Sequence, residues 1–172
     1  HHGYDWTDSA IMSRTLPPNP LTDAQTDGAP LPLVAVRDRF LDWLFQKALP
    51  FWATTGCDGT PHELALLGAQ EHLTLEGEPA LPPFKRVRVQ ARQLFAFSWA
   101  ALQGWEEGVS RAHGIFRFML HAHREDGGWA RTLTREGAVK DATADLYDIA
   151  FVVFALAWYG RLEGSGDRKS TV

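Results

Sequence analysis

The sequence predicts an all-α protein in which amphipathic helices alternate with helices that are apolar on almost every side. Residues 86–99 and 145–158 are apolar nearly all round, a pattern that a globular fold permits only for helices covered on most faces. Residues 33–49 and 107–123 instead carry one apolar stripe. Alternating outer and inner helices build an α/α barrel or toroid. A four-helix bundle, the competing architecture, would make all four helices similarly amphipathic.

The first unit of this alternation covers the N-terminal half of the chain. An outer helix is expected over residues 33–49, ended by Pro50 because proline lacks the N–H that a helix needs. A short β-hairpin is expected next, with strands at 62–67 and 72–75 on either side of Gly68. The inner helix follows over residues 86–102.

The second unit repeats the same order. An outer helix is expected over residues 107–123, and a second short hairpin over residues 129–139. The inner helix is expected over residues 144–161, with Thr143 as its N-cap. The chain is therefore a weak repeat of one supersecondary unit.

Composition limits the class of protein. The chain has 172 residues, 45% of them apolar, and Lys+Arg 17 against Asp+Glu 21 gives a net charge of about −4. That balance, with no long basic run, argues against nucleic-acid binding. The single Cys57 excludes an internal disulfide and fits a reducing cytoplasm. No apolar run reaches the roughly 18 residues needed to span a bilayer.

Three regions of the chain are expected to differ in order. Residues 1–30 are interpreted as a tag remnant, His1-His2, and a weakly ordered leader, since they are polar and rich in proline and aspartate. Residues 31–162 form the helical repeat. Residues 163–172 are expected to be a polar tail.

Four short segments carry a resemblance to a known family. They are Leu49–Trp52 with the following Gly56 and Asp58, then Arg88–Gln93, Asp126–Trp129 and Asp145–Phe151. In this order they resemble the N-terminal part of the N-acylglucosamine 2-epimerase family, which includes mannose isomerases and cellobiose epimerases. The resemblance covers residues 31–162.

The resemblance implies an (α/α)6 barrel of twelve helices that binds a sugar in its central cleft. Members of the family interconvert aldoses and ketoses or epimerise at C2, without a metal or other cofactor. Two histidines in the later part of the family's chain serve as acid and base, and no segment here resembles the motifs that hold them. We therefore expect this chain to correspond to about one third of the barrel and to be inactive by itself.

Arg92 is the candidate catalytic residue. Proton transfer at C2 of an open-chain sugar passes through an enediol or enediolate, and an arginine stabilises that charge because it stays protonated and presents a fork of donors. The resemblance places Arg92 at the family's arginine position. The alternative is a salt bridge that joins two inner helices.

Tyr147, Arg88 and Trp129 are the candidate substrate-binding residues. The resemblance implies that Tyr147 lines the sugar cleft, although a core tyrosine with a satisfied hydroxyl is an equal reading. Arg88 lies one turn before Arg92 and would extend a basic cleft suited to a phosphorylated sugar, but a solvated helix start is favoured. Trp129 beside Gly128 would stack on a pyranose at the cleft rim or simply pack.

Other reactive side chains are given lesser roles. Glu63 and His62 lie on the expected first hairpin, where they would reach the rim. The spacing of His113, His121 and His123 does not suit one ion, so no metal site is predicted. Cys57 has no histidine partner nearby in sequence, which argues against a thiol nucleophile.

The leading hypothesis is a cytoplasmic sugar isomerase or 2-epimerase, of the mannose–fructose or the N-acylglucosamine–N-acylmannosamine type, with a monosaccharide substrate. The alternative is a non-catalytic α-helical module that serves association. Because two uncovered inner helices would leave Phe97, Phe151, Phe154 and Trp158 in solvent, we expect self-association or a complementing chain. The choices between free sugar and phosphosugar, and between isomerase and epimerase, stay open.

Overall fold

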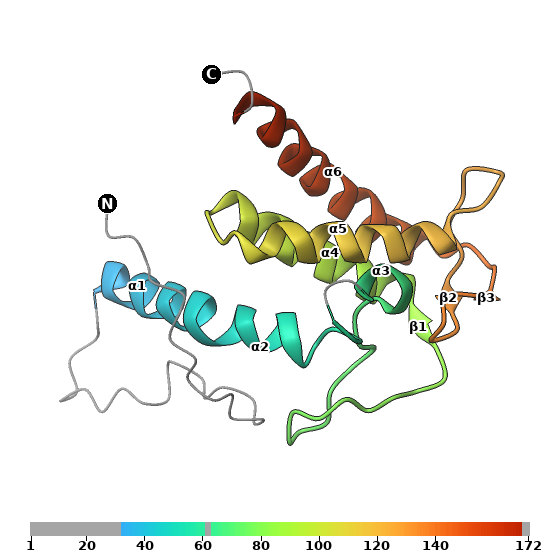
Figure 1. Ribbon diagram of the computed structural model, residues 1–172, viewed down its shortest axis with the longest axis horizontal. Helices are drawn as coiled ribbons and strands as arrows, with labels where there is room; N and C mark the ends of the chain where they lie inside the picture. The colour runs from blue at the N-terminus through green and yellow to red at the C-terminus, as the bar shows by residue number, and fades with distance from the viewer. Residues whose placement is uncertain (1–31, 61–62, 170–172) are drawn as a thin grey trace.

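A computed structural model describes residues 32–60 and 63–169 of the protein. The predicted leader over residues 1–30, and His62, lie outside the described residues. The described chain is mainly helical, as Figure 1 shows. Within the described ranges, no helix is both long enough and apolar enough to cross a membrane.

The first helical segment is longer than predicted. Helix α1 (Leu33–Trp43) continues through a π-helical turn η1 (Leu44–Ala48) into α2 (Leu49–Thr54), so Pro50 does not end the helix. Pro50 lies in the first turn of α2, directly after the π-helical turn, where a missing N–H costs little. The prediction that this proline stops the helix is therefore wrong.

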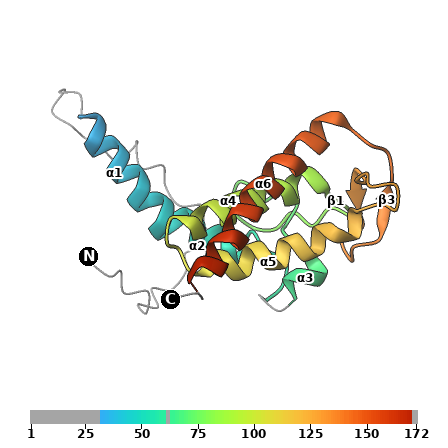
Figure 2. The same cartoon turned by 90° about the horizontal axis from the view of Figure 1, so that it is seen from above.

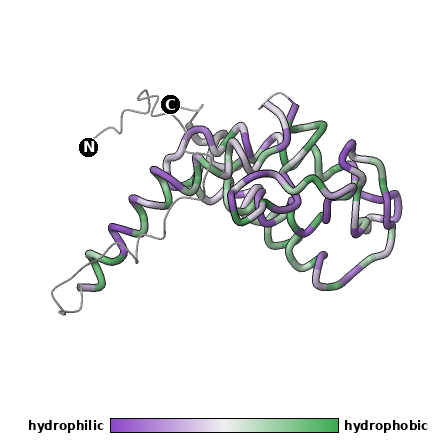
Figure 3. Tube along the Cα trace, turned by 90° about the horizontal axis from the view of Figure 1, so that it is seen from below, coloured by the Kyte–Doolittle hydropathy of each residue, from purple (hydrophilic) through white to green (hydrophobic). Residues whose placement is uncertain are grey.

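Helix α1 projects away from the body formed by the later helices (Figure 2). None of its residues is buried, and Leu33 and Phe40 are exposed. Hydrophobic and hydrophilic residues alternate along it, as Figure 3 shows. The amphipathic pattern predicted for an outer helix is thus present, but its apolar stripe is left largely uncovered.

The first predicted hairpin is wrong in its first strand. Residues Leu64–Leu67 form a short helix, α3, which ends at Gly68 with a positive φ of 66°. The carboxylate of Glu63 accepts hydrogen bonds from the amide and the hydroxyl of Thr60, which holds the chain in a tight turn rather than a strand. Extended pairing occurs instead in two isolated bridges, where Cys57 lies opposite Ala69 and where Leu73 lies opposite Pro79.

Helices α4 (Val87–Leu102) and α5 (Glu107–Met119) form a helical hairpin at the centre of the body. Helix α5 ends in a 3₁₀ turn, η2 (Leu120–Ala122). Both helices bury large apolar side chains in one continuous core: Leu94, Phe97, Ile115, Phe118 and Met119 are fully buried. Phe97, which was expected to meet solvent, is therefore covered, because α5 and Trp105 pack against it.

Helix α6 (Leu146–Lys169) lies across α4, and its N-cap is Asp145 rather than the predicted Thr143. The Asp145 carboxylate accepts hydrogen bonds from the amides of Tyr147 and Asp148, as an N-cap does. The helix continues through residues 163–169, which were expected to be a polar tail.

The burial predicted for the two inner helices holds for α4 but not for α6. Helix α6 buries a narrow stripe that includes Val152 and Ala155, while Val153 and Phe154 are exposed. Helix α5, predicted to be an outer helix, is more buried than α6. The reason is that α4 and part of α5 cover one side of α6, and its remaining apolar side faces solvent.

The second predicted hairpin is confirmed and belongs to a small sheet. Strand β2 (Thr132–Leu133) pairs antiparallel with β3 (Val139–Asp141) on one side and with β1 (Lys85–Arg86) on the other. Strand β1 leads directly into α4, so the sheet lies at the N-terminal end of that helix. The sheet and the starts of α4 and α6 therefore lie at the same end of the molecule (Figure 2).

Candidate active site

Arg92 and Tyr147 meet at the junction of α4 and α6. The Arg92 Nη2 donates a hydrogen bond of 3.0 Å to the hydroxyl of Tyr147. The same guanidinium lies 4.2 Å from the centre of the Phe151 ring, a cation–π distance. Arg92 is exposed and Tyr147 is 56% exposed. The pair therefore presents a cation and a phenol to solvent while it joins the two helices.

Arg88 lies one turn before Arg92 and contacts Asp148, the residue that follows Tyr147 in α6. Its Nη1 donates a 2.9 Å hydrogen bond to the carboxylate of Asp148, which is only 3% exposed. This hydrogen bond raises the pKa of the Arg88 guanidinium. The favoured interpretation of Arg88 as a solvated helix start is wrong, because the side chain is partly buried and ion-paired.

The carboxylate of Asp148 is only partly satisfied. One oxygen accepts from Arg88, while the other, Oδ2, is buried and has no hydrogen-bond donor. The Nε of Arg131 lies 4.0 Å from Oδ2. A buried acceptor without a donor destabilises the folded state, and the positive charges of Arg88 and Arg131 near Asp148 offset part of that cost.

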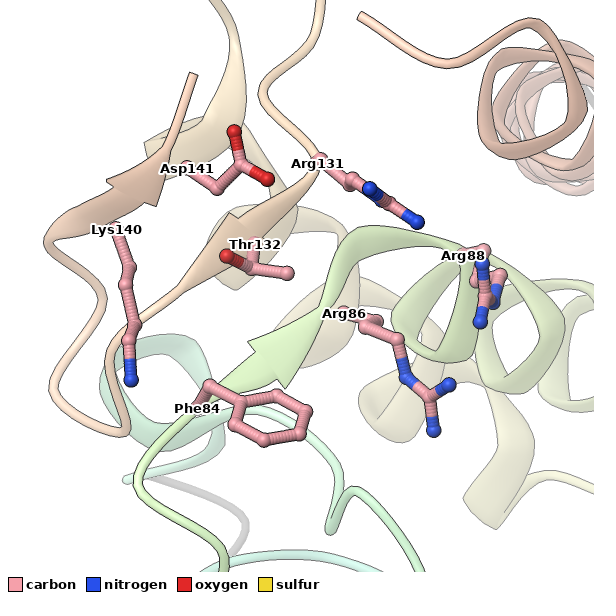
Figure 4. Close-up of a pocket in the computed structure, with 7 residues that line it drawn as sticks. All are labelled: Phe84, Arg86, Arg88, Arg131, Thr132, Lys140 and Asp141. Carbon is pink, nitrogen blue, oxygen red and sulfur yellow. The ribbon is translucent and has the colours of Figure 1, made fainter. Parts of the chain in front are cut away.

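A pocket of about 390 Å³ opens beside Arg88, between the start of α4 and the β2–β3 hairpin. Figure 4 shows the side chains that line it. The lining residues are Phe84, Arg86, Arg88, Arg131, Thr132, Lys140 and Asp141. Four of the seven are cationic. Arg88 belongs to this lining and also lies 5.8 Å from the centre of the Tyr147 ring, so the pocket adjoins the Arg92–Tyr147 pair.

A buried carboxylate also holds the arginine that precedes α4. Glu71 is 5% exposed and accepts hydrogen bonds from the Arg86 amide, at 2.7 Å, and from the Arg86 guanidinium. Arg86 is thereby fixed in position with its charge balanced. Sequence reasoning missed Glu71, Asp148, Arg131 and Lys140, because their partners are distant in the chain.

Trp129 contacts a different set of residues from Arg88 and Arg92. It lies in the turn between η2 and β2, opposite His123 in an isolated antiparallel bridge. The two rings are 5.2 Å apart, and the indole packs against the edge of the core. Trp129 is not among the residues that line the pocket beside Arg88. The structure thus brings together Arg88, Arg92 and Tyr147 but joins Trp129 to a different set of neighbours.

A buried charge cluster anchors the hairpin that forms one wall of the pocket. The fully buried Lys85 donates to the Asp58 carboxylate at 2.8 Å and to the carbonyl of Leu67. Arg135, in the β2–β3 turn, donates to the same Asp58 oxygen at 2.6 Å. Burial lowers the pKa of Lys85, and the hydrogen bond to Asp58 opposes that shift.

The other candidate side chains have structural roles. The Glu63 carboxylate is occupied by Thr60, whose amide hydrogen bond lowers its pKa. Cys57 is buried, which raises the pKa of its thiol to about 11 and keeps it protonated at neutral pH. His113 bonds the hydroxyl of Tyr159 at 2.8 Å. Among the described residues, no group of three or more histidine, cysteine or carboxylate side chains is placed to hold a metal ion.

Comparison with known proteins identifies the family to which this chain is similar. Residues 68–169 match the N-acylglucosamine 2-epimerase family. A curated relative, a mannose-6-phosphate isomerase of Rhizobium meliloti (strain 1021), is 33% identical over 117 residues, which are 67% of this chain and 29% of the relative.

Solved structures agree on the fold. The cellobiose 2-epimerase of Spirochaeta thermophila DSM 6192 superposes with a TM-score of 0.67 at 27% identity, covering 77% of this chain and 32% of that one. A D-mannose isomerase matches with a TM-score of 0.62 at 22% identity, over 76% of this chain and 32% of that one. The chain thus spans about a third of the length of the relatives that it matches. It belongs to the N-acylglucosamine 2-epimerase family.

Proposed function

We propose that this chain contributes one side of the sugar-binding cleft of an aldose–ketose isomerase or 2-epimerase. The observation that carries the proposal is the Arg92–Tyr147 pair, exposed at the junction of two packed helices. Family membership supports the enzyme class. The relatives and solved structures are named for mannose 6-phosphate, D-mannose and cellobiose, which supports a carbohydrate substrate of the mannose or N-acylglucosamine type.

The remaining parts of the proposal follow from the family's architecture. Helices α4 and α6 would be two inner helices of an (α/α)6 barrel, with the cleft at the end where the β1–β2–β3 sheet lies. Catalysis would be metal-independent and would take place in the cytoplasm. The acid and base that move the C2 proton would come from other parts of the barrel.

In the proposed reaction, Arg92 stabilises charge rather than moving a proton. Removing the C2 proton of an open-chain sugar places negative charge on the C1 oxygen of the enediolate. The exposed guanidinium donates hydrogen bonds to that oxygen and remains charged throughout. Tyr147 accepts one Arg92 N–H and so fixes the direction of the fork, while Phe151 supports the plane of the guanidinium from the side.

The test uses the full-length protein that carries this sequence. Arg92→Ala should lower turnover of mannose or N-acylmannosamine by about 100-fold or more, since one charge-stabilising donor contributes on the order of 2.7–4 kcal/mol. Arg117→Ala removes an exposed arginine from α5 and is the matched control. Wild-type turnover in purified, folded Arg92→Ala protein would refute the assignment.

Tyr147→Phe separates the two members of the pair. The ring contact with Phe151 is kept, and only the hydroxyl that orients Arg92 is lost. Loss of one such hydrogen bond should lower turnover by roughly tenfold or less, well short of the Arg92→Ala effect. A larger loss than in Arg92→Ala would assign the tyrosine hydroxyl a direct part in the chemistry.

A second candidate function is association without catalysis, and one observation favours it. The outer side of α6 exposes Leu146, Val153 and Phe154, the last of them 47% exposed. Exposed apolar patches often mark association surfaces. The chain would then self-associate or bind a complementing chain through this side. Light scattering of the 172-residue chain at micromolar concentration tests this directly: a monodisperse 19.2 kDa monomer would rule out self-association.

A further inference from the structure

The cationic pocket beside Arg88 is a feature that the Arg92–Tyr147 pair does not explain. We propose that it is an anion subsite that binds the phosphate group of a phosphosugar. This inference rests on the proposed function, because it takes the sugar to lie at the Arg92–Tyr147 pair. It would settle the choice between free sugar and phosphosugar in favour of the latter.

The arrangement of charges carries the first step. The pocket lining contains Arg86, Arg88, Arg131 and Lys140, but Asp141 is its one carboxylate. The buried carboxylates Glu71 and Asp148 lie behind Arg86 and Arg88 and pair with them. Four cations thus face three carboxylates, which leaves an excess of positive charge on the side that opens to solvent.

Arg131 and Lys140 hold that excess. The Arg131 side chain is 45% exposed, and its one ion pair, to Asp148, has the long N–O distance of 4.0 Å. The Lys140 ammonium makes one long hydrogen bond, 3.4 Å, to the carbonyl of Pro83 and lies 5.6 Å from the Phe84 ring. Each side chain therefore keeps most of its N–H donors for an incoming anion.

The geometry suits a phosphate. Figure 4 shows the guanidinium groups of Arg131, Arg86 and Arg88 on one side of the view and Lys140 on the other, with its ammonium group beside Phe84, so cationic side chains line the pocket from two sides. Arginine forks bind phosphate oxygens in pairs, and a lysine ammonium adds a point charge. The volume of about 390 Å³ lies within the usual range for small-molecule pockets, about 300–1,000 Å³.

The position of the pocket links it to the sugar. Arg88 is shared, since it lines the pocket and also lies over the Tyr147 ring at 5.8 Å. Arg92 is one helical turn further along the same face of α4. A hexose phosphate can therefore place its phosphate among Arg131, Arg88 and Lys140 while its carbonyl end lies at Arg92.

The buried carboxylate of Asp148 also bears on the position of Arg131. Oδ2 is buried without a donor, although Arg131 is only 4.0 Å away. At this distance Arg131 makes no hydrogen bond to Oδ2, so its N–H groups can turn toward an anion in the pocket.

The first experiment measures binding to the 172-residue chain. Amide NMR shifts of the β2–β3 hairpin are followed during titration with inorganic phosphate, mannose 6-phosphate and mannose at low salt, since screening weakens exposed charges. Arg131→Gln and Lys140→Gln should each weaken phosphate and mannose 6-phosphate binding roughly fivefold or more, because each removes a charged donor. Arg131→Lys, which keeps the charge, should restore part of the affinity.

Lys47→Gln is the matched control. It removes the same charge from an exposed lysine of η1, which is not part of the pocket. We expect its affinity for phosphate to stay within about twofold of wild type, as an unspecific change of net charge would predict. Three results would overturn the proposal: no shift in the hairpin amides, an equal loss in Lys47→Gln, or inorganic phosphate that fails to compete with mannose 6-phosphate.

Turnover by the full-length protein separates this proposal from the proposed function. If mannose 6-phosphate binds in the pocket but neither sugar is converted, the subsite stands and the enzyme proposal fails. If free mannose is converted and the phosphate gives no advantage in kcat/KM, the enzyme proposal stands and the subsite fails. If Arg131→Gln lowers kcat/KM for the phosphosugar more than for the free sugar, the two proposals are supported together.

Discussion

Gln90 offers the sharpest test of how the α4 motif holds the fold. Its side chain is fully buried, its Oε1 accepts from the Ala69 amide at 2.7 Å, and its Nε2 donates to the Ala69 carbonyl at 3.0 Å. The neighbouring groups of that loop already pair with residues 56 and 58 on its other edge. Gln90 therefore completes the backbone pairing of Ala69 from inside the core.

Gln90→Met keeps the length of the side chain and removes both hydrogen bonds. The buried amide and carbonyl of Ala69 are then unpaired, at about 1–3 kcal/mol each, and the more apolar methionine offsets part of that cost. We expect the free energy of unfolding to fall by about 2–4 kcal/mol, which for a chain of this size lowers Tm by roughly 5–15 °C. Urea unfolding followed by circular dichroism measures the change.

Gln46→Met is the control, because it makes the same substitution at an exposed position of η1. Its stability should stay within about 0.5 kcal/mol of wild type. A loss below 0.5 kcal/mol in Gln90→Met as well would mean that water or a shifted backbone satisfies Ala69, and the reasoning would be wrong.

Three further predictions concern the packing around this loop and the hairpin. Gly68→Ala should destabilise the protein by roughly 1–3 kcal/mol more than Gly104→Ala. Both positions have positive φ, but a Cβ at Gly68 would lie 2.3 Å from the Phe118 ring, whereas a Cβ at Gly104 would have no heavy atom within 4 Å. Equal losses of stability in thermal melts would contradict this. Because burial raises the pKa of the Cys57 thiol from an ordinary 9.0 to about 11, the folded protein keeps the thiol proton to higher pH than the unfolded chain does. The free energy of unfolding should therefore fall by about 2 kcal/mol as pH rises from 9 to 11. Cys57→Ala should remove that part of the alkaline loss, and an unchanged pH profile would disprove the assignment. Asp58→Asn should lower the free energy of unfolding by about 3 kcal/mol or more, because the charge of the buried Lys85 loses its partner carboxylate. Adding Lys85→Met to the same chain should recover much of that loss. Strictly additive losses in the double variant would show that the two residues do not interact.

The helical part of the fold could be predicted from the sequence because its signals are local. Apolar periodicity located α4, α5 and the start of α6 to within a few residues, although α6 runs to Lys169 rather than ending near residue 161. The turn around Gly137 located the β2–β3 hairpin. The prediction of the first hairpin failed because the hydrogen bond from the Thr60 amide to the Glu63 carboxylate, just before α3, outweighs the preference of a short apolar run for the β conformation.

Burial could be predicted less well, because an apolar pattern does not say which neighbour covers it. Helix α6 is apolar nearly all round, yet within the described residues α4 and α5 cover only one side of it. Helix α5 looked amphipathic because Arg111 falls outside its apolar stripe. That arginine is nevertheless buried, with Glu107 one turn away as its partner.

The candidate site was predictable only where the family resemblance supplied it. Arg92 and Tyr147 were chosen from motifs, and the structure shows that they are hydrogen-bonded across 55 residues of sequence. Asp148 lies next to Tyr147 in sequence, yet nothing local predicts its pairing with Arg88, 60 residues away. Arg131 and Lys140 looked like ordinary hairpin charges until the fold set them beside α4.

The segment Arg88–Arg92 makes two separate sets of contacts, and helix geometry explains how one short segment makes both. Arg88 and Arg92 are one turn apart and lie on the side of α4 that meets Tyr147 and Asp148. Gln90 is two residues from each, about 200° around the helix, and therefore points to the opposite side, where Ala69 lies. A change at Gln90 should thus cost stability and leave the arginines in place, whereas a change at Arg92 should cost chemistry and little stability. Because the two faces share no partner, the stability effects of Gln90→Met and Arg92→Ala should add within about 0.5 kcal/mol in the double variant.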